Sequence, residues 1–166
     1  MPAPTAMHSA IETKLFDLLS GINAVAFPNS YNYTPQGVAR VEEFNVDYLR
    51  DEMATVYLLR PGHETETKRS TCAFFRRAEF FVLGARKWQE ASTNPHRENL
   101  PRSEVQSRLE EDLKTCLLQD FSLGGLTYDV QLTDTEYEFD VEGSFQWAVV
   151  EVRLVADYVY RKRVVA

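Results

Sequence analysis

The spacing of hydrophobic positions predicts two amphipathic helices. The first is expected from about Ala6 to Ser20, with Gly21 as its stop. Its apolar stripe consists of Ile11, Leu15, Leu18, Leu19 and Ile22. The second is expected to begin at a capping box formed by Ser103 and Gln106. Its apolar stripe consists of Val105, Leu109, Leu113, Cys116, Leu117 and Phe121. Each helix therefore has one face to bury.

Between the two helices the pattern is typical of β-structure. Alternation over residues 44–48 predicts a short strand, and residues 53–59 are apolar on both faces, as in a central strand. Pro61 and Gly62 are expected to end that strand, with a solvated polar turn over residues 63–68. Residues 71–88 favour one long strand, because aromatic and β-branched side chains are frequent there.

Two segments are predicted to be loops. Residues 23–37 combine prolines, a glycine and aromatic side chains, a mixture that excludes a regular central strand. The aromatic residues of this loop, Tyr31 and Tyr33 among them, either pack the loop onto the domain or anchor it on a partner. Residues 89–101 form a second, polar loop that ends in a Leu-Pro pair.

The C-terminal part of the chain predicts a long β-hairpin over residues 126–160. Its last strand has one continuous apolar face, made of Ala148, Val150, Val152, Leu154, Ala156 and Tyr158. A type II′ turn at Gly143-Ser144 would pair Tyr137 with Val150 on this face. The apolar residues between Leu126 and Leu132 have the opposite parity, so one extra residue near Thr133-Asp134-Thr135 is required. This mismatch predicts a β-bulge.

The order of the elements predicts an α+β fold, in which two helices pack on one face of a mainly antiparallel sheet with a long C-terminal β-hairpin. A chain of 166 residues suits a single domain spanning residues 1–166, and it can bury a core without metal or disulfides. Cys72 and Cys116 lie among apolar residues and are expected to be reduced core thiols.

Composition and charge narrow the classes of partner. The chain is 44% hydrophobic and 26% charged, as ordinary globular proteins are. Its formal net charge of -7 argues against a surface that grips nucleic acid throughout, although DNA could pass nearby without adhering. The apolar runs are too short to cross a bilayer and the N-terminus lacks a signal-peptide pattern. We therefore expect a cytoplasmic protein without a membrane partner.

No catalytic or cofactor motif stands out. His8, His63 and His96 lack metal-ligand spacing, and there is no phosphate loop, dinucleotide fingerprint or nucleophile motif. The sequence therefore predicts a protein that is not an enzyme, with no catalytic residues, no metal and no cofactor.

The predicted hairpin has an acidic outer face, formed by Glu136, Glu138, Asp140 and Glu142. Such a face is usually the solvated side of a strand, and a metal site is the less favoured alternative. Near the turn, however, Phe145 and Trp147 lie beside Asp140 and Glu142. Two large aromatics there suggest a partner surface, and packing under a loop of the same chain is the alternative.

Basic residues form a loose group around the long strand and its loop: Arg76, Arg77, Arg86, Lys87, Arg97 and Arg102. This group is either a local positive face for a neighbouring subunit or an ordinary mixed surface. We take Arg86 and Lys87, with Tyr31, Tyr33 and the four residues near the hairpin turn, as candidates for a subunit or tube interface.

Several segments resemble tail terminator (tail completion) proteins of long-tailed bacteriophages. The similarity covers about two-thirds of the chain, as a pattern of elements and not as a catalytic signature. It is carried by the strand Arg76–Val82, the helix end Leu117–Asp120, the segment Ser122–Val130 with its Leu-Gly-Gly turn, the last strand Ala148–Tyr158 and the helix Ile11–Ile22. The loops 23–37 and 89–101 are long for this family, so no ring contact is carried over to them.

The resemblance implies a virion protein of the tail–neck region, assembled in the host cytoplasm. It would form a ring, expected to be a homohexamer, that caps the tail tube, ends tail polymerisation and joins the tail to the head connector. Its partners would be the tail tube protein and a head-completion or connector protein, and DNA would pass through the ring without sequence-specific binding. The alternatives are another neck or head–tail joining protein, a metal-dependent enzyme that uses the acidic hairpin face, or a ligand-binding domain.

Overall fold

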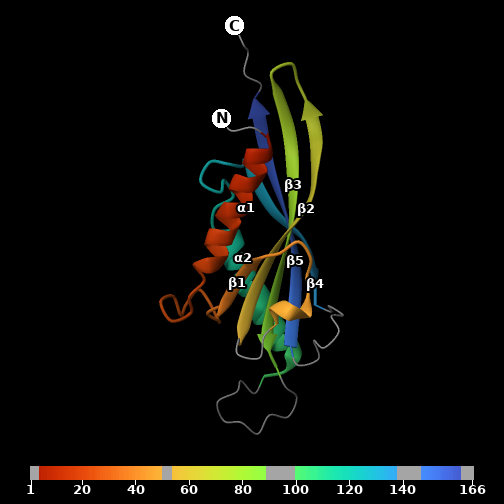
Figure 1. Ribbon diagram of the computed structural model, residues 1–166. Coiled ribbons are helices and arrows are strands. Elements are labelled where there is room, and N and C mark those ends of the chain that lie inside the picture. The colour runs from red at the N-terminus through yellow and green to blue at the C-terminus, as the bar shows by residue number, and fades with distance from the viewer. Residues whose placement is uncertain (1–3, 50–53, 89–99, 138–146, 162–166) are drawn as a thin grey trace.

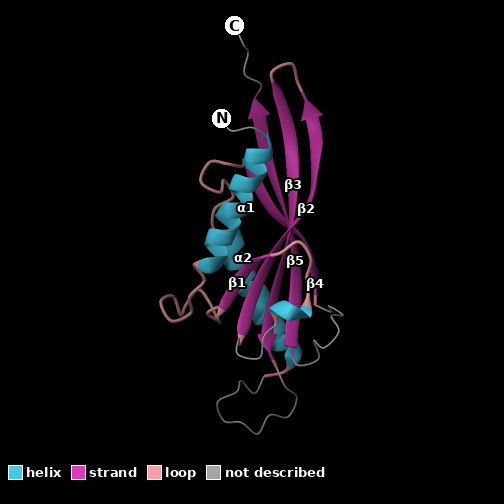
Figure 2. Ribbon diagram, in the orientation of Figure 1, coloured by secondary structure: helices cyan, strands magenta, loops and turns pink. Residues whose placement is uncertain are grey.

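Two helices cover one face of a five-stranded sheet in the computed structural model, which describes residues 4–49, 54–88, 100–137 and 147–161 (Figures 1 and 2). The elements are α1 (Pro4–Ser20), β1 (Gly37–Arg40), the 3₁₀ helix η1 (Val46–Tyr48), β2 (Thr55–Arg69), β3 (Ala73–Lys87), α2 (Arg102–Leu117), β4 (Asp129–Glu136) and β5 (Trp147–Arg161). The strand order is β1-β2-β3-β5-β4, and only β1 pairs in parallel with its neighbour. The predicted α+β class is confirmed.

The main core lies between the helices and the sheet face that they cover, here called the inner face. Both predicted helix stripes contribute to it, for example through Ile11, Leu15 and Leu109, which are fully buried. Every residue of the predicted apolar face of β5 is also fully buried there, from Ala148 to Tyr158. Alternation along β5 therefore identified the covered face correctly.

The predicted bulge is present between β4 and β5. Leu132 pairs with Leu154, but Asp134 pairs with Arg153, so Thr133 is the extra residue on β4. It lets Val130 and Thr135 both point toward the inner face despite their opposite parity. The predicted pairing of Tyr137 and the turn at Gly143-Ser144 lie outside the described ladder.

Two strand predictions are wrong. Residues 44–48 contain η1 and no strand, because the Asn45 side-chain oxygen accepts a hydrogen bond from the Asp47 backbone N–H at 3.0 Å and curls the chain locally. β2 does not end at Pro61-Gly62 but continues to Arg69, so the predicted turn over residues 63–68 is strand. Pro61 is tolerated because β1 pairs only up to Leu59 and the β2–β3 ladder is irregular just after Pro61.

Helix α2 also corrects the sequence prediction at both ends. Pro101, not Ser103, is the N-cap, and no side chain caps the helix. The Gln106 amide instead donates to the Val149 carbonyl at 3.0 Å, which ties α2 to the sheet. At the other end the helix stops at Leu117, which leaves Phe121 outside it and 63% exposed.

Candidate functional site

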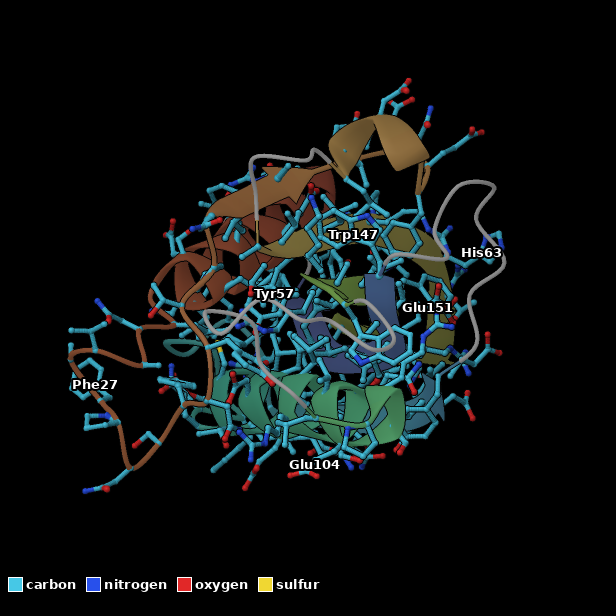
Figure 3. The ribbon with its side chains drawn as sticks, turned by 90° about the horizontal axis from the view of Figure 1, so that it is seen from below. Phe27, Tyr57, His63, Glu104, Trp147 and Glu151 are labelled. Atoms are coloured by element: carbon cyan, nitrogen blue, oxygen red, sulfur yellow. The ribbon has the colours of Figure 1, made fainter. Side chains whose placement is uncertain are left out.

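Of the hairpin residues proposed as an interface, the structure describes Trp147, and its side chain is buried. Trp147 is only 3% exposed, so the expectation of an uncovered tryptophan is wrong. It lies on the sheet face opposite to the helices, here called the outer face, while Tyr57 lies on the inner face (Figure 3). Asp140, Glu142 and Phe145 lie outside the described residues.

A segment of the same chain packs against the cluster that contains Trp147. A second core cluster on the outer face joins Trp147 to Val41, Val56, Leu58, Leu83, Ala85 and Val149. Phe44 and Leu49, on either side of η1, pack against this cluster. Packing under a loop of the same chain, the alternative drawn from the sequence, is therefore the correct interpretation for Trp147.

The structure brings together Tyr33 and Arg86 from the predicted set. The Arg86 guanidinium lies 4.0 Å from the centre of the Tyr33 ring and donates to the Thr55 hydroxyl at 2.7 Å. Tyr33 is only 5% exposed, whereas Tyr31 and Lys87 are partly buried. Tyr33 and Arg86 join the 23–36 loop to the end of β3, so the four side chains do not form one open contact surface.

Asp112 fixes the same loop and was missed in the sequence. Its carboxylate is fully buried and accepts hydrogen bonds from the backbone N–H of Asn32 at 2.7 Å and of Tyr33 at 2.9 Å. Burial raises the pKa of Asp112 although these donors favour its ionised form. The signal that could have identified it is an acidic residue beside Leu109 and Leu113 in an apolar helical stripe.

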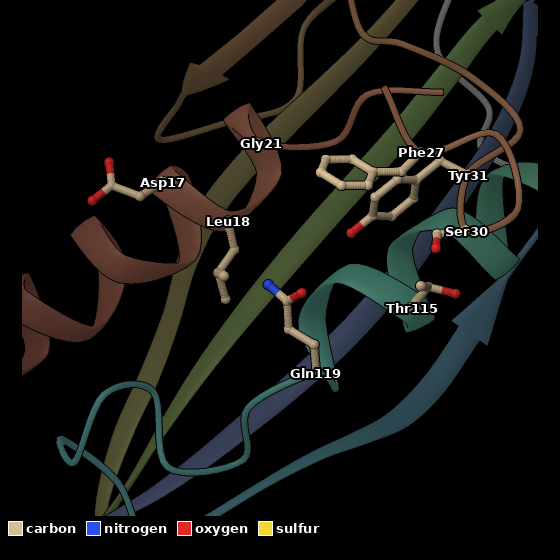
Figure 4. A pocket seen from close by; sticks show the side chains of 8 residues that line it. All are labelled: Asp17, Leu18, Gly21, Phe27, Ser30, Tyr31, Thr115 and Gln119. Carbon is tan, nitrogen blue, oxygen red and sulfur yellow. The ribbon is translucent and has the colours of Figure 1, made fainter. Parts of the chain in front are cut away.

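A pocket of about 310 Å³ opens where the ends of both helices meet the 23–36 loop (Figure 4). Its lining combines apolar side chains with hydroxyl, amide and carboxylate groups: Asp17, Leu18, Gly21, Phe27, Ser30, Tyr31, Thr115 and Gln119. The rings of Phe27 and Tyr31 lie together on one side, and Asp17 lies at the far edge (Figure 4). Phe27 is 56% exposed, so the pocket is an open depression of the surface. Its lining residues do not combine an acid, a base and a nucleophile in the arrangement that catalysis needs.

The outer face beyond the Trp147 cluster is charged. A hollow of about 420 Å³ is lined by Glu79, Phe81, Asp134, Thr135, Glu136, Glu151 and Arg153. We call this hollow the acidic face. Arg153 is ion-paired with Glu79 and, at 3.1 Å, with Asp134. Burial raises the pKa of Glu151, and its cross-strand neighbour Glu136 raises it further while Arg60 opposes the shift.

The hairpin of β2 and β3, with β5 paired along β3, projects beyond the helices (Figure 1). We call residues 63–77 the arm. His8 of α1 stacks on Phe80 at 5.0 Å, so α1 covers the sheet only up to the base of the arm. From His63 to Cys72 every residue is exposed, which corrects the expectation that Cys72 is a core thiol.

Cations and aromatic rings alternate across the arm's end. Lys68 lies over the Phe75 ring at 5.6 Å, and Arg69 over the Phe74 ring at 5.1 Å. Phe74 stacks on Tyr160 of β5 at 6.2 Å. The arm thus carries amphipathic surface away from the core, as an intermolecular contact would need.

Within the four described ranges, no group of three or more His, Cys, Asp or Glu side chains is arranged to hold a metal ion. None of the described helices has the length and apolar character needed to cross a membrane. No protein-family model and no curated protein matches the chain.

Proposed function

We propose that this chain is a structural virion protein, a tail terminator that forms a ring at the end of the tail tube of a long-tailed bacteriophage. In this role it ends tube polymerisation and presents a surface to the head connector. It needs no cofactor and performs no catalysis, and DNA passes through the ring without sequence-specific binding. The ring is proposed to be a homohexamer.

The observation that carries the proposal is where the family-like segments lie in the fold. Arg76–Val82 of β3 pairs residue by residue with the stretch of β5 from Val152 to Tyr158. The Leu-Gly-Gly segment joins α2 to β4, with positive φ angles at Leu123, Gly124 and Gly125. Segments far apart in the sequence thus form one continuous half of the sheet, as expected if they are the shared framework of a family.

The arm gives independent support. A ring subunit must present surfaces that leave its own core intact, and such surfaces commonly come from projecting strands. Here the core is completed by α1, α2 and the 41–49 segment, while the arm stays exposed.

The test is end-specific capping. Purified chain, labelled with gold through a tag, is added to polymerising tail tubes of the phage that encodes it and imaged by negative stain. We expect label at one end of each tube, and tubes that stop growing when the chain is present. Label along the tube sides, or unchanged elongation, would contradict the proposal. A twelve-membered ring in place of a six-membered one would assign the chain to the head connector instead.

A further inference from the structure

The arm and the acidic face are complementary in charge. At the arm's end, Lys68 and Arg69 lie near Arg161, since Arg161 pairs with Ala73 just after the turn. Glu66 forms a 2.8 Å ion pair with Arg69, so the formal charge of these four side chains is +2. On the acidic face, four carboxylates surround Arg153, and Arg60 is a second cation near Glu151 in the described part of the chain. One surface is therefore positive and the other negative.

These two surfaces cannot meet within one chain. Leu83 lies level with Glu151 of the acidic face, and Ala73 starts β3 at the arm's end. At a rise of roughly 3.3 Å per residue, the two positions are about 30 Å apart along β3. The sheet is continuous between them, so the arm cannot fold back. Only a second molecule can bring them into contact.

We propose that the arm's end of one subunit docks on the acidic face of the next copy of the same chain. The contact is heterologous, because each subunit offers its arm on one side and its acidic face on the other. Repetition of such a contact closes into a ring when the rotation between subunits allows it. The inference rests on the proposed ring and adds which surfaces form it.

The aromatic residues of the arm fit this role better than they fit a solvated ribbon. β5 pairs with β3 up to Ala73, so the arm belongs to a three-stranded end of the sheet that projects beyond both helices (Figure 1). Phe74 and Phe75 give each face of the arm an aromatic ring with a cation above it. When the arm docks, the rings supply apolar contact and Lys68 and Arg69 reach the carboxylates.

Charge reversal tests the contact without a tail tube. Variant A is Lys68→Glu with Arg69→Glu, and variant B is Asp134→Lys with Glu136→Lys; all four positions are exposed. Association is measured by sedimentation velocity over a concentration series at low salt. Each variant alone should associate at least about tenfold more weakly than the parent, because like charges then face each other.

An equimolar mixture of A and B should restore association. The acidic arm of A then meets the basic face of B, and the unchanged arm of B meets the unchanged face of A. The matched control is Glu42→Lys with Glu43→Lys, which changes net charge as much as variant B and should associate as the parent does. Melting curves confirm that all variants are folded. If the mixture stays as weak as its components, the proposal is wrong.

Cross-linking covers the case of weak association in solution. The exposed thiol of Cys72 marks the arm's end, whereas Cys116 is buried. Parent chain is mixed with the Cys72→Ser, Gln131→Cys variant, which carries its accessible thiol on β4 beside the acidic face, and a short bismaleimide is added. Cross-links between parent and variant are expected.

Three outcomes would overturn the proposal. The first is cross-linking that occurs only between parent chains, and the second is no cross-link at any concentration. The third comes from measuring single-stranded DNA binding as well: variant A loses that binding, while the association of variants A and B is unchanged. The last would make the arm a nucleic-acid contact. Ring formation through arm and face without tube capping would refute the terminator function alone.

Discussion

Replacement of Trp147 by alanine should strongly destabilise the isolated chain. The indole is 3% exposed and belongs to the outer-face cluster with Val56, Leu83 and Val149. Truncation of a buried tryptophan removes its transfer free energy and leaves a cavity, which together cost about 3–5 kcal/mol. For a chain of this size, about 2–4 °C of melting temperature is lost per kcal/mol, so the shift is roughly 6–20 °C.

The matched control is Phe27→Ala. Phe27 is also aromatic but is 56% exposed at the rim of the 310 Å³ pocket, so its loss should cost no more than about 1 kcal/mol. Both variants are compared with the parent by circular dichroism melting and by urea titration. In a Trp88→Phe background, the emission of Trp147 should be blue-shifted in the native state and move to the red on unfolding.

If the Trp147→Ala and Phe27→Ala chains both have the melting temperature of the parent, the assignment of Trp147 to a core is refuted. It would restore the sequence-based idea that this side chain is available to a partner. A large loss of stability supports the view that contacts must be sought elsewhere on the outer face.

Three further results are expected. Deletion of Thr133 should turn the side chains of part of β4 to the wrong face of the sheet. We expect the free energy of unfolding from urea titrations to fall by at least about 3 kcal/mol. A urea midpoint equal to that of the parent would rule the bulge out. Arg77→Ala should lower the free energy of unfolding by about 1–2 kcal/mol in urea titrations, because the buried Asp157 carboxylate loses donors at 2.8 and 2.9 Å. Arg77→Lys should recover only part of this loss, and full recovery by lysine would contradict a bidentate role for Arg77. Burial raises the pKa of Cys116 to about 12, so the folded chain keeps the thiol protonated while the unfolded chain ionises above about pH 8.5. Stability should therefore fall as pH rises between these values, by up to about 1.4 kcal/mol per unit, and Cys116→Ala should flatten this slope in urea titrations from pH 8 to 10; an unchanged slope would contradict it.

Parity arguments predicted the sheet well where one face is covered by helices. Alternation along β5 and the phase change at Thr133 are local properties of the sequence, and a buried face leaves little freedom in register. These signals predicted which side chains of the last two strands lie on the inner face, and they predicted one extra residue on β4.

Other features depend on contacts between distant segments. Gln106 looks like the end of a capping box, but a carbonyl on β5 offers its amide a buried partner. Pro61 looks like the end of a strand, but the β1 ladder has already stopped at Leu59, so the missing N–H costs no pairing. The sequence shows which groups need partners, and the fold decides which partners they find.

Trp147 shows why interfaces are hard to infer from alternation. Its parity placed it correctly on the outer face, but parity does not show how much of that face another segment of the chain covers. The 41–49 segment packs on the cluster that contains Trp147, and Arg60 lies at the border, with its guanidinium 5.1 Å from the Phe44 ring and 4.3 Å from the Phe81 ring. Beyond Arg60 the side chains change to carboxylates and arginines. Where the cover ends, the lining of the described hollow is mainly charged, with Phe81 as its large apolar side chain. Charge is therefore the main basis on which a partner could be selected there, and this is why we propose the cationic arm of another copy, and not an apolar partner, as its occupant.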